Sequence, residues 1–162
     1  LKLDNNNSAK ALGISFYLWS KKRFKNLENH AKVSVNTKID VHHIIPDNYL
    51  KKQFGEYSEE YDYSDSILNK IRINKISNIK IGDKSPKIYL NEIKDKIPNP
   101  DIINCLDSHV IGNSSKLISG DYDNDYFSFL KNRYKAMSPL FNQLKIASER
   151  LNDGKHDDIW KD

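Results

Sequence analysis

A short strand that ends at a proline is the feature that most limits how this chain can fold. Residues Val33 to Val41 alternate, imperfectly, between polar and β-branched side chains, which is the two-residue period of a half-buried strand. The run continues as Val41-His42-His43-Ile44-Ile45-Pro46, and Pro46 stops the strand because proline has no amide hydrogen to give to a sheet. We therefore expect two adjacent histidines at the end of a strand.

A second strand and a helix start are expected further along the chain. Residues Ile67 to Ile73 alternate in the same way, which places Asn69 on one strand face with the isoleucines. The segment from Asn74 to Asn78 then begins a helix or turn. The intervening Gly55 to Ser66 is rich in tyrosine and acidic residues and has no hydrophobic period, so we expect it to be a loop.

Helical periods account for most of the remaining chain. Further helices are expected at about residues 8–26, 47–54, 86–93 and 101–110, with a last long helix from about residue 123 to 151. The expected apolar face of the last helix is Tyr126, Leu130, Tyr134, Met137, Phe141 and Leu144. Pro139 is expected to kink it. The sequence thus predicts an α+β fold that is mostly helical.

Length and composition limit the class of protein. A chain of 162 residues with 38% hydrophobic and 30% charged residues is typical of one globular domain. Cys105 is the single cysteine, which excludes an internal disulfide framework and a cysteine-based zinc ribbon, and we expect it on the buried side of a helix. No apolar run approaches the roughly 20 residues that span a bilayer. The chain starts without a methionine or a signal-peptide pattern, and we expect it to be part of a longer, intracellular protein.

Charge is distributed in blocks along the chain. The net charge of +4 favours a polyanionic partner only weakly. Residues 21–38 and 70–96 are strongly basic, whereas residues 56–65 carry acids and no base. A single run of this kind is usually a solvated face of the protein. Two basic segments on either side of the paired histidines are more suggestive of a nucleic-acid partner.

The paired histidines allow two interpretations. Adjacent residues of a strand point to opposite faces, so that His42 and His43 can simply be one packed and one exposed side chain. If instead the strand ends between them, both can turn toward one pocket. One histidine can then bind a cation while the other takes a proton from water, because histidine suits both tasks near neutral pH. The pair alone slightly favours the structural interpretation.

Taken with the segments that follow, the pair resembles the ββα-metal motif of the HNH endonuclease superfamily. The matching runs are His43-Ile44-Ile45-Pro46, Ile67-Leu68-Asn69-Lys70 and Lys75-Ile76-Ser77-Asn78. Three later runs are similar to one branch, the C-terminal nuclease domain of GmrSD-like type IV restriction proteins. These runs are Gly82-Asp83-Lys84-Ser85-Pro86, Leu106-Asp107-Ser108-His109-Val110-Ile111 and Phe129-Leu130-Lys131-Asn132-Arg133. The resemblance covers about residues 12–150.

The resemblance implies a role for each matched residue. His43 corresponds to the general base that deprotonates water, and Asn69 to the residue that ties the loop together and orients that base. His42 and Asn78 correspond to the ligands of one divalent cation. Asp40, two residues before His42 on the same strand face, could hold the metal-bound imidazole, although a surface aspartate is equally compatible.

The resemblance also implies a cofactor and partners. The cofactor would be Mg²⁺ or Mn²⁺, with Ni²⁺ or Zn²⁺ as alternatives, because a nitrogen and amide-oxygen ligand set matches Mg²⁺ less well than carboxylates do. The substrate would be double-stranded DNA, modified or foreign, with Lys80 and Lys84 as candidate phosphate contacts. A sensor or nucleotide-hydrolysing domain would precede this chain. The location would be the cytoplasm of a bacterium or archaeon, without membrane contact.

The implied domain is a single HNH nuclease unit spanning residues 1–162. Its ββα core would cover about residues 33–95, between an N-terminal helix at about 8–26 and a helical part at about 101–151. Two alternatives stay open: a catalytically silent DNA-binding or protein-interaction module on the same fold, and a purely helical interaction domain. The sequence does not distinguish DNA from RNA. His109 lies in a matched run, but we expect it to pack against a helix.

Overall fold

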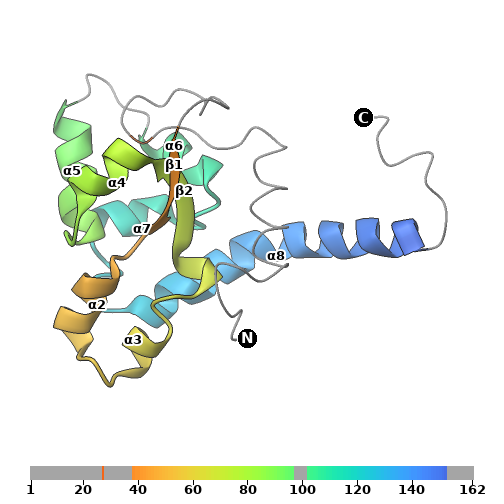
Figure 1. Ribbon diagram of the computed structural model, residues 1–162, viewed down its shortest axis with the longest axis horizontal. Helices are drawn as coiled ribbons and strands as arrows, with labels where there is room; N and C mark the ends of the chain where they lie inside the picture. The colour runs from red at the N-terminus through yellow and green to blue at the C-terminus, as the bar shows by residue number, and fades with distance from the viewer. Residues whose placement is uncertain (1–26, 28–37, 97–101, 153–162) are drawn as a thin grey trace.

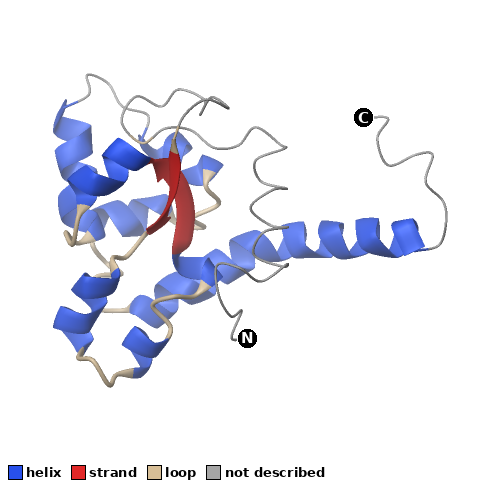
Figure 2. Ribbon diagram, in the orientation of Figure 1, coloured by secondary structure: helices blue, strands red, loops and turns tan. Residues whose placement is uncertain are grey.

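The computed structural model describes Leu27, residues 38–96 and residues 102–152, in which helices surround a pair of strands (Figures 1 and 2). The helix expected at residues 8–26 and the first part of the expected strand, residues 33–37, lie outside the described residues. The strands are β1 (Ile39–His43) and β2 (Lys70–Asn74). The fold is therefore α+β and mostly helical, as predicted.

The two strands form an antiparallel hairpin with two distinct faces. His42 lies opposite Ile71, and His43 lies opposite Lys70. Because alternate residues of a strand point to opposite faces, His42 shares a face with Ile71 and Ile73, which are buried. The other face carries His43 and also Val41, whose exposed fraction is 38%. Both histidines lie within β1, so the strand does not end between them and they do not turn toward one pocket. The interpretation of one packed and one exposed histidine describes the structure.

The predicted second strand begins later than expected. Ile67 to Asn69 form a turn of 3₁₀ helix, and β2 starts only at Lys70. The Ser66 hydroxyl begins this turn by accepting a hydrogen bond from the Leu68 amide. Ile67 and Leu68 are consecutive and both buried, which a strand with one solvated face does not allow. The prediction that Asn69 lies within a strand was wrong.

Two short helices connect the strands. α2 (Asp47–Phe54) has the predicted bounds and follows Pro46 directly. α3 (Glu59–Asp62) lies inside the acidic segment that was predicted to be a loop. The Ser58 side chain caps α3 by accepting from the Tyr61 amide, and acidic residues in its first turn suit the positive end of the helix dipole. α3 is stabilised by these local interactions and buries no residue, so it has no hydrophobic period. For this reason the segment was wrongly predicted to be a loop.

The next two helices begin where the sequence indicates. α4 (Lys75–Ile81) follows β2 without a connecting residue, and the Asn74 side chain caps it by accepting from the Ile76 amide. α5 (Pro86–Lys96) has proline at its first position, where a missing amide hydrogen costs nothing. Asn78 therefore lies one helical turn beyond the end of β2.

The helices α6 (Ile102–Ser108) and α7 (Ser114–Ser119) are joined by a tight connection. α6 ends before Val110, which has a φ of 57° and was wrongly expected on the helix; α7 was not predicted. Gly112 has a φ of 94°, and a Cβ atom there would lie 2.7 Å from the Asn132 carbonyl oxygen. Only glycine allows the chain to approach this closely.

α8 (Tyr126–Asn152) is the long helix that extends away from the other elements in Figure 1. It continues through Pro139. Tyr134 was predicted on its apolar face but is 40% exposed, and the fully buried residue is instead its neighbour Arg133. The buried side chains of α8 are Tyr126, Phe129, Leu130, Arg133, Met137 and Leu140. The predicted Tyr126, Leu130 and Met137 are buried, and Leu144 lies outside the residues whose side chains are described. Arg133 takes the place expected for Tyr134, because a hydrophobic period does not place arginine in a core.

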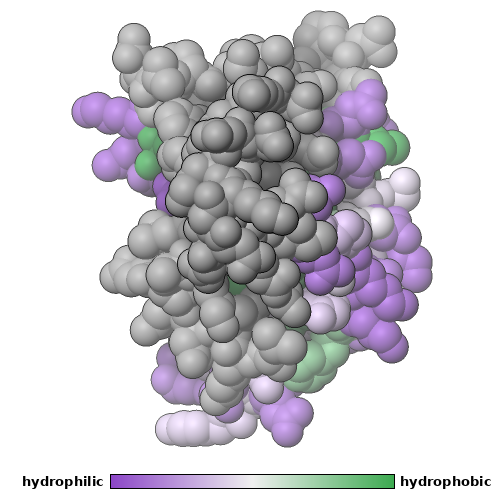
Figure 3. All heavy atoms as spheres, turned by 90° about the vertical axis from the view of Figure 1, so that its right-hand side faces the viewer, coloured by the Kyte–Doolittle hydropathy of each residue, from purple (hydrophilic) through white to green (hydrophobic). Residues whose placement is uncertain are grey.

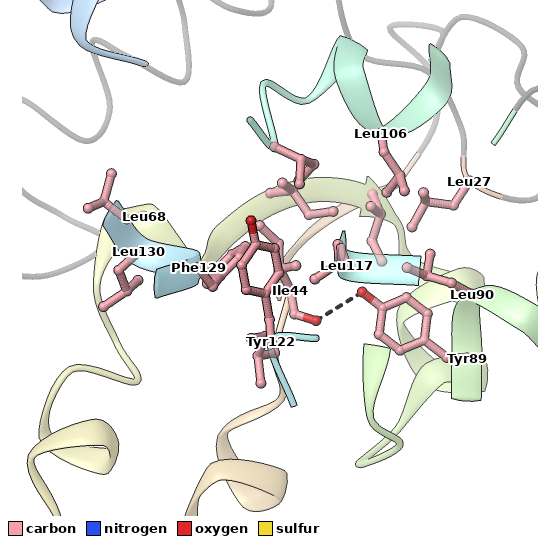
Figure 4. Packing of buried hydrophobic residues seen from close by; sticks show 14 of the residues in the cluster. Leu27, Ile44, Leu68, Tyr89, Leu90, Leu106, Leu117, Tyr122, Phe129 and Leu130 are labelled. Atoms are coloured by element: carbon pink, nitrogen blue, oxygen red, sulfur yellow. Dashed lines mark hydrogen bonds between the residues drawn. The ribbon is translucent and has the colours of Figure 1, made fainter. Parts of the chain in front are cut away.

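The core packs α7, α8 and the hairpin around buried aromatic rings (Figure 4). Tyr89 of α5 lies among these residues, and its hydroxyl donates to the Ile44 carbonyl oxygen over 2.9 Å, as the dashed line in Figure 4 shows. This hydrogen bond fixes the chain directly after the two histidines. Cys105 is fully buried, as predicted.

None of the helices within the described residues is long and apolar enough to cross a membrane. On the face seen in Figure 3, the described side chains are mostly hydrophilic, with scattered apolar ones.

Arg133 ties three parts of the fold together. Its guanidinium is 1% exposed and donates to the Lys70 carbonyl oxygen over 2.8 Å and to the His109 carbonyl oxygen over 3.4 Å. Among the described residues it has no carboxylate partner, and burial lowers its pKa to about 9. His109 is itself buried, in agreement with the expected packing role. One side chain therefore joins α8, the start of β2 and the end of α6.

Replacement of Arg133 should destabilise the whole fold. We expect Arg133→Ala to lower the free energy of unfolding by about 3 kcal/mol or more, because it leaves a cavity and two unpaired carbonyl groups. Arg133→Met should cost less, since it fills the space and removes a buried charge. Urea denaturation measures both, with the exposed Lys131→Ala as the control on the same helix. A loss for Arg133→Ala no larger than that of the control would contradict this role.

Candidate functional site

A chain of polar contacts joins β1 to α4. The Asn78 side chain donates from Nδ2 to Asp40 Oδ2 over 3.3 Å, and its Oδ1 lies 2.8 Å from Nδ1 of His42. A carboxylate can only accept, so Asp40 turns the amide nitrogen of Asn78 toward itself and directs Oδ1 to His42. His42 therefore donates from Nδ1. Asp40, expected either near His42 or on the surface, lies in this chain of contacts.

Burial keeps His42 neutral. The side chain is 4% exposed and meets the Tyr89 ring edge-on, with the ring centroids 5.9 Å apart. Desolvation lowers the pKa of His42 to about 4, and the hydrogen bond to Asn78 opposes the shift only in part. A neutral imidazole is the form that binds a metal ion.

The spacing of His42 and Asn78 is compatible with a small divalent cation. Two ligand atoms at right angles around such a cation, each about 2.1 Å from it, lie about 3.0 Å apart. The Nδ1 and Oδ1 atoms are 2.8 Å apart. A cation between them would replace the shared proton and require the ring proton to move to Nε2, a buried atom that has no hydrogen-bond partner in the described part of the chain. Among the described residues, no group of three His, Cys, Asp or Glu side chains is placed to hold a metal.

His43 lies on the opposite face of the hairpin, in a more open setting. Its Nε2 atom is 3.2 Å from Oδ1 of Asp65, and the two side chains are 30% and 54% exposed. The same Asp65 oxygen accepts from Nζ of Lys70 over 2.5 Å. The exposed ring can thus reach a molecule in solution, whereas the ring of His42 cannot do so without a change in its surroundings.

Asn69 ties together the two segments that carry His43 and Asp65. Its Oδ1 accepts from the Ile45 amide over 2.9 Å, and its Nδ2 donates to the carbonyl oxygens of Ile45 and Ser64, both over 2.9 Å. Its own carbonyl oxygen accepts from the Ile44 amide over 2.8 Å. The side chain is fully buried. These hydrogen bonds tie the segment after β1 to the segment before β2, from a 3₁₀ turn. That Asn69 orients a catalytic base stays a prediction.

The predicted phosphate contacts lie elsewhere on the surface. Lys80 and Lys84 occupy the last turn of α4 and the connection after it, and the Nζ atom of Lys84 is paired with Glu92 over 2.6 Å. Their contact with DNA stays a prediction. Asp65 and Lys70 were not predicted as site residues, because Asp65 looked like one more acid of a solvated loop. No local sequence signal identifies it, because its role depends on contacts with His43 and Lys70.

Comparisons with known proteins identify no relative. No family model, curated protein or solved structure matches the chain. The geometry of the described residues is therefore the basis for the functional argument below, together with the resemblance of the motifs.

The Asn69 hydrogen bonds should contribute strongly to stability. We expect Asn69→Asp to lower the free energy of unfolding by roughly 2–4 kcal/mol, because a carboxylate cannot donate to the two carbonyl oxygens. Urea denaturation measures the change. The matched control is Asn91→Asp, since the Asn91 amide donates to Lys87 on an exposed helix surface. If Asn69→Asp and Asn91→Asp lowered the free energy of unfolding by similar amounts, the buried hydrogen bonds of Asn69 would not contribute more to stability than an exposed one.

The environment of His42 should make the fold sensitive to acid. The unfolded imidazole takes up a proton near its ordinary pKa of 6.5, whereas the folded one resists protonation until about pH 4. The unfolded state therefore binds more protons in this window, and stability falls as the pH falls. Between the two pKa values, protonation of His42 should lower the free energy of unfolding of the wild type by about 3 kcal/mol. We expect His42→Phe to lack this loss.

The measurement is the free energy of unfolding of both proteins, without metal, at several values from neutral to acid pH. The difference between the variant and the wild type should shift in favour of His42→Phe as the pH falls. Parallel pH profiles would show that His42 is not buried as the geometry indicates.

Proposed function

We propose that this chain is a metal-dependent DNA endonuclease domain of the HNH type, which hydrolyses phosphodiester bonds. The observation that carries the proposal is the contact between His42 and Asn78, two residues 36 positions apart in the sequence. The motif resemblance requires these residues to meet. A purely helical domain with incidental histidines gives no reason for it.

Three further features support the same assignment. β1 pairs with β2, and α4 follows β2 directly, which gives a ββα arrangement with α2 and α3 inserted between the strands. Asn69 holds the segment after β1 against the start of β2, as the resemblance implies. His43 stays accessible, with 30% of its side chain exposed. A part in restriction or phage defence rests on the resemblance of the Gly82–Pro86 and Phe129–Arg133 segments.

The residues divide the work of hydrolysis between them. His43 accepts a proton from a water molecule, whose oxygen forms a bond to phosphorus while the bond to the leaving 3′-oxygen breaks. His42 and Asn78 would hold the divalent cation, and Asp40 fixes the amide of Asn78. When bound, such a cation would offset negative charge on the phosphate and on the leaving oxygen. This requires a change in the surroundings of the buried His42, so that it and His43 reach the same phosphate. Asn69 keeps the backbone next to His43 in place.

A nicking assay on supercoiled plasmid DNA tests the proposal. We expect cleavage by the wild type in Mg²⁺ or Mn²⁺ and a loss of about 100-fold or more for His43→Ala, since general-base catalysis contributes about that much. Val41→Ala, on the same strand and face, is the matched control and should retain activity. His42→Ala and Asn78→Ala should raise the metal concentration needed, and a thermal-shift titration with Mn²⁺ should show weaker binding for both.

Other outcomes lead to different conclusions. Equal cleavage by the wild type and His43→Ala would remove His43 as the base. DNA binding without cleavage would favour the catalytically silent module. Absence of both metal binding and DNA binding would favour an interaction domain, and cleavage of a matched RNA alone would change the substrate class.

A further inference from the structure

The acidic segment between the strands ends next to His43. Asp65 is the last acid of residues 56–65, and Ser66 directly after it begins the 3₁₀ turn that leads to Lys70. Since Lys70 lies opposite His43 in the hairpin, this turn brings the Asp65 carboxylate to the imidazole. Asp65 Oδ1 lies 3.2 Å from Nε2 of His43. The rest of the segment has no contact of this kind with either histidine.

Lys70 holds Asp65 in place. Its Nζ atom is 2.5 Å from the same Oδ1 atom, and its side chain is only 3% exposed, whereas that of Asp65 is 54% exposed. Its backbone carbonyl oxygen accepts from Arg133, so that the residue is fixed at both ends. Burial alone would raise the pKa of Asp65, but the hydrogen bonds from Lys70 and His43 lower it below its usual value. Asp65 is therefore a carboxylate at neutral pH.

A carboxylate beside Nε2 decides which nitrogen of His43 carries the proton. An ionised Asp65 can only accept, so the neutral ring must donate from Nε2 and keep its lone pair on Nδ1. We propose that Asp65, anchored by Lys70, is the positioning residue of His43: it sets the tautomer and the ring orientation, and so makes Nδ1 the atom that receives the proton from water. This inference rests on the proposed function for its catalytic meaning.

The proton balance of the step follows from this arrangement. The water proton goes to Nδ1, the water oxygen goes to phosphorus, and the Nε2 proton stays in the hydrogen bond to Asp65 throughout. Asp65 faces the positive charge that the ring gains. The acidic segment, which looked like a solvated loop, thus contributes its last residue to the site.

Steady-state kinetics on DNA give the first test. We expect Asp65→Ala to lower kcat by about 10- to 100-fold with KM nearly unchanged, as is typical when a residue that orients another side chain is lost. Asp65→Glu should restore part of the activity. Asp62→Asn, which removes one charge from the same segment on α3, is the matched control and should leave kcat unchanged.

A double substitution tests the role of Lys70. If Lys70 acts only through Asp65, Lys70→Met combined with Asp65→Ala should lower kcat no more than Asp65→Ala alone. Additive losses in the double variant would overturn the anchoring role. Equal kcat for Asp65→Ala and the wild type would overturn the positioning role.

The tautomer of His43 gives a test that does not depend on cleavage. Nitrogen chemical shifts of the ring, recorded by NMR at mildly alkaline pH, distinguish a protonated Nε2 from a protonated Nδ1. We expect Nε2 to carry the proton in the wild type and a mixture of tautomers in Asp65→Ala. A proton on Nδ1 in the wild type would overturn the inference. An inactive protein with the expected tautomer would leave Asp65 in its place and refute only the nuclease function.

Discussion

The amide side chain of Asn69 is the interaction on which the rest of the candidate site depends. It satisfies the amide and carbonyl groups of Ile45 and the carbonyl group of Ser64, all of them away from water. These groups belong to the segment that leaves β1 and to the segment that enters β2. Because one planar group binds both, the positions of His43 and Asp65 are set relative to each other. A buried amide that makes three hydrogen bonds, two as donor and one as acceptor, holds the two segments rigidly together.

His42 and His43 differ in burial and charge environment because they point to opposite faces of the two-stranded sheet. His42 points inward, loses its hydration and stays neutral over a wide range of pH. His43 points outward, and its nearest partners are a carboxylate and, through it, an ammonium group. A single step along the chain therefore separates a buried, neutral imidazole from an exposed imidazole beside a carboxylate. The alternation of a β-strand is sufficient to produce this division.

Short-range signals allowed much of the fold to be predicted. Pro46 and Pro86 gave correct positions for α2 and α5, and a helix or turn was correctly expected to begin at Asn74 to Asn78. The alternation before His42 correctly indicated a strand that leads to the paired histidines. The pairing of His42 with Asn78 was predicted through the motif resemblance. The predicted elements were wrong where a polar side chain decides the local structure. Hydrogen bonds of Ser66 and Asn69 make the start of the predicted second strand a 3₁₀ turn. In α8, buried Arg133 shifts the core face away from Tyr134.

Asp65 could not have been predicted, because its role depends on tertiary contacts with His43 and Lys70. The same applies to Arg133, whose burial depends on contacts with distant segments. Its charge and that of Lys70 are buried, and Asp65 is the only carboxylate paired with either of them among the described residues. The ion pair of Lys70 runs from the interior to the surface, because the Lys70 side chain is 3% exposed and that of Asp65 is 54% exposed. The charge of Arg133 is met by the carbonyl oxygens of Lys70 and His109, so loss of Asp65 would leave two buried cations without a carboxylate partner among the described residues.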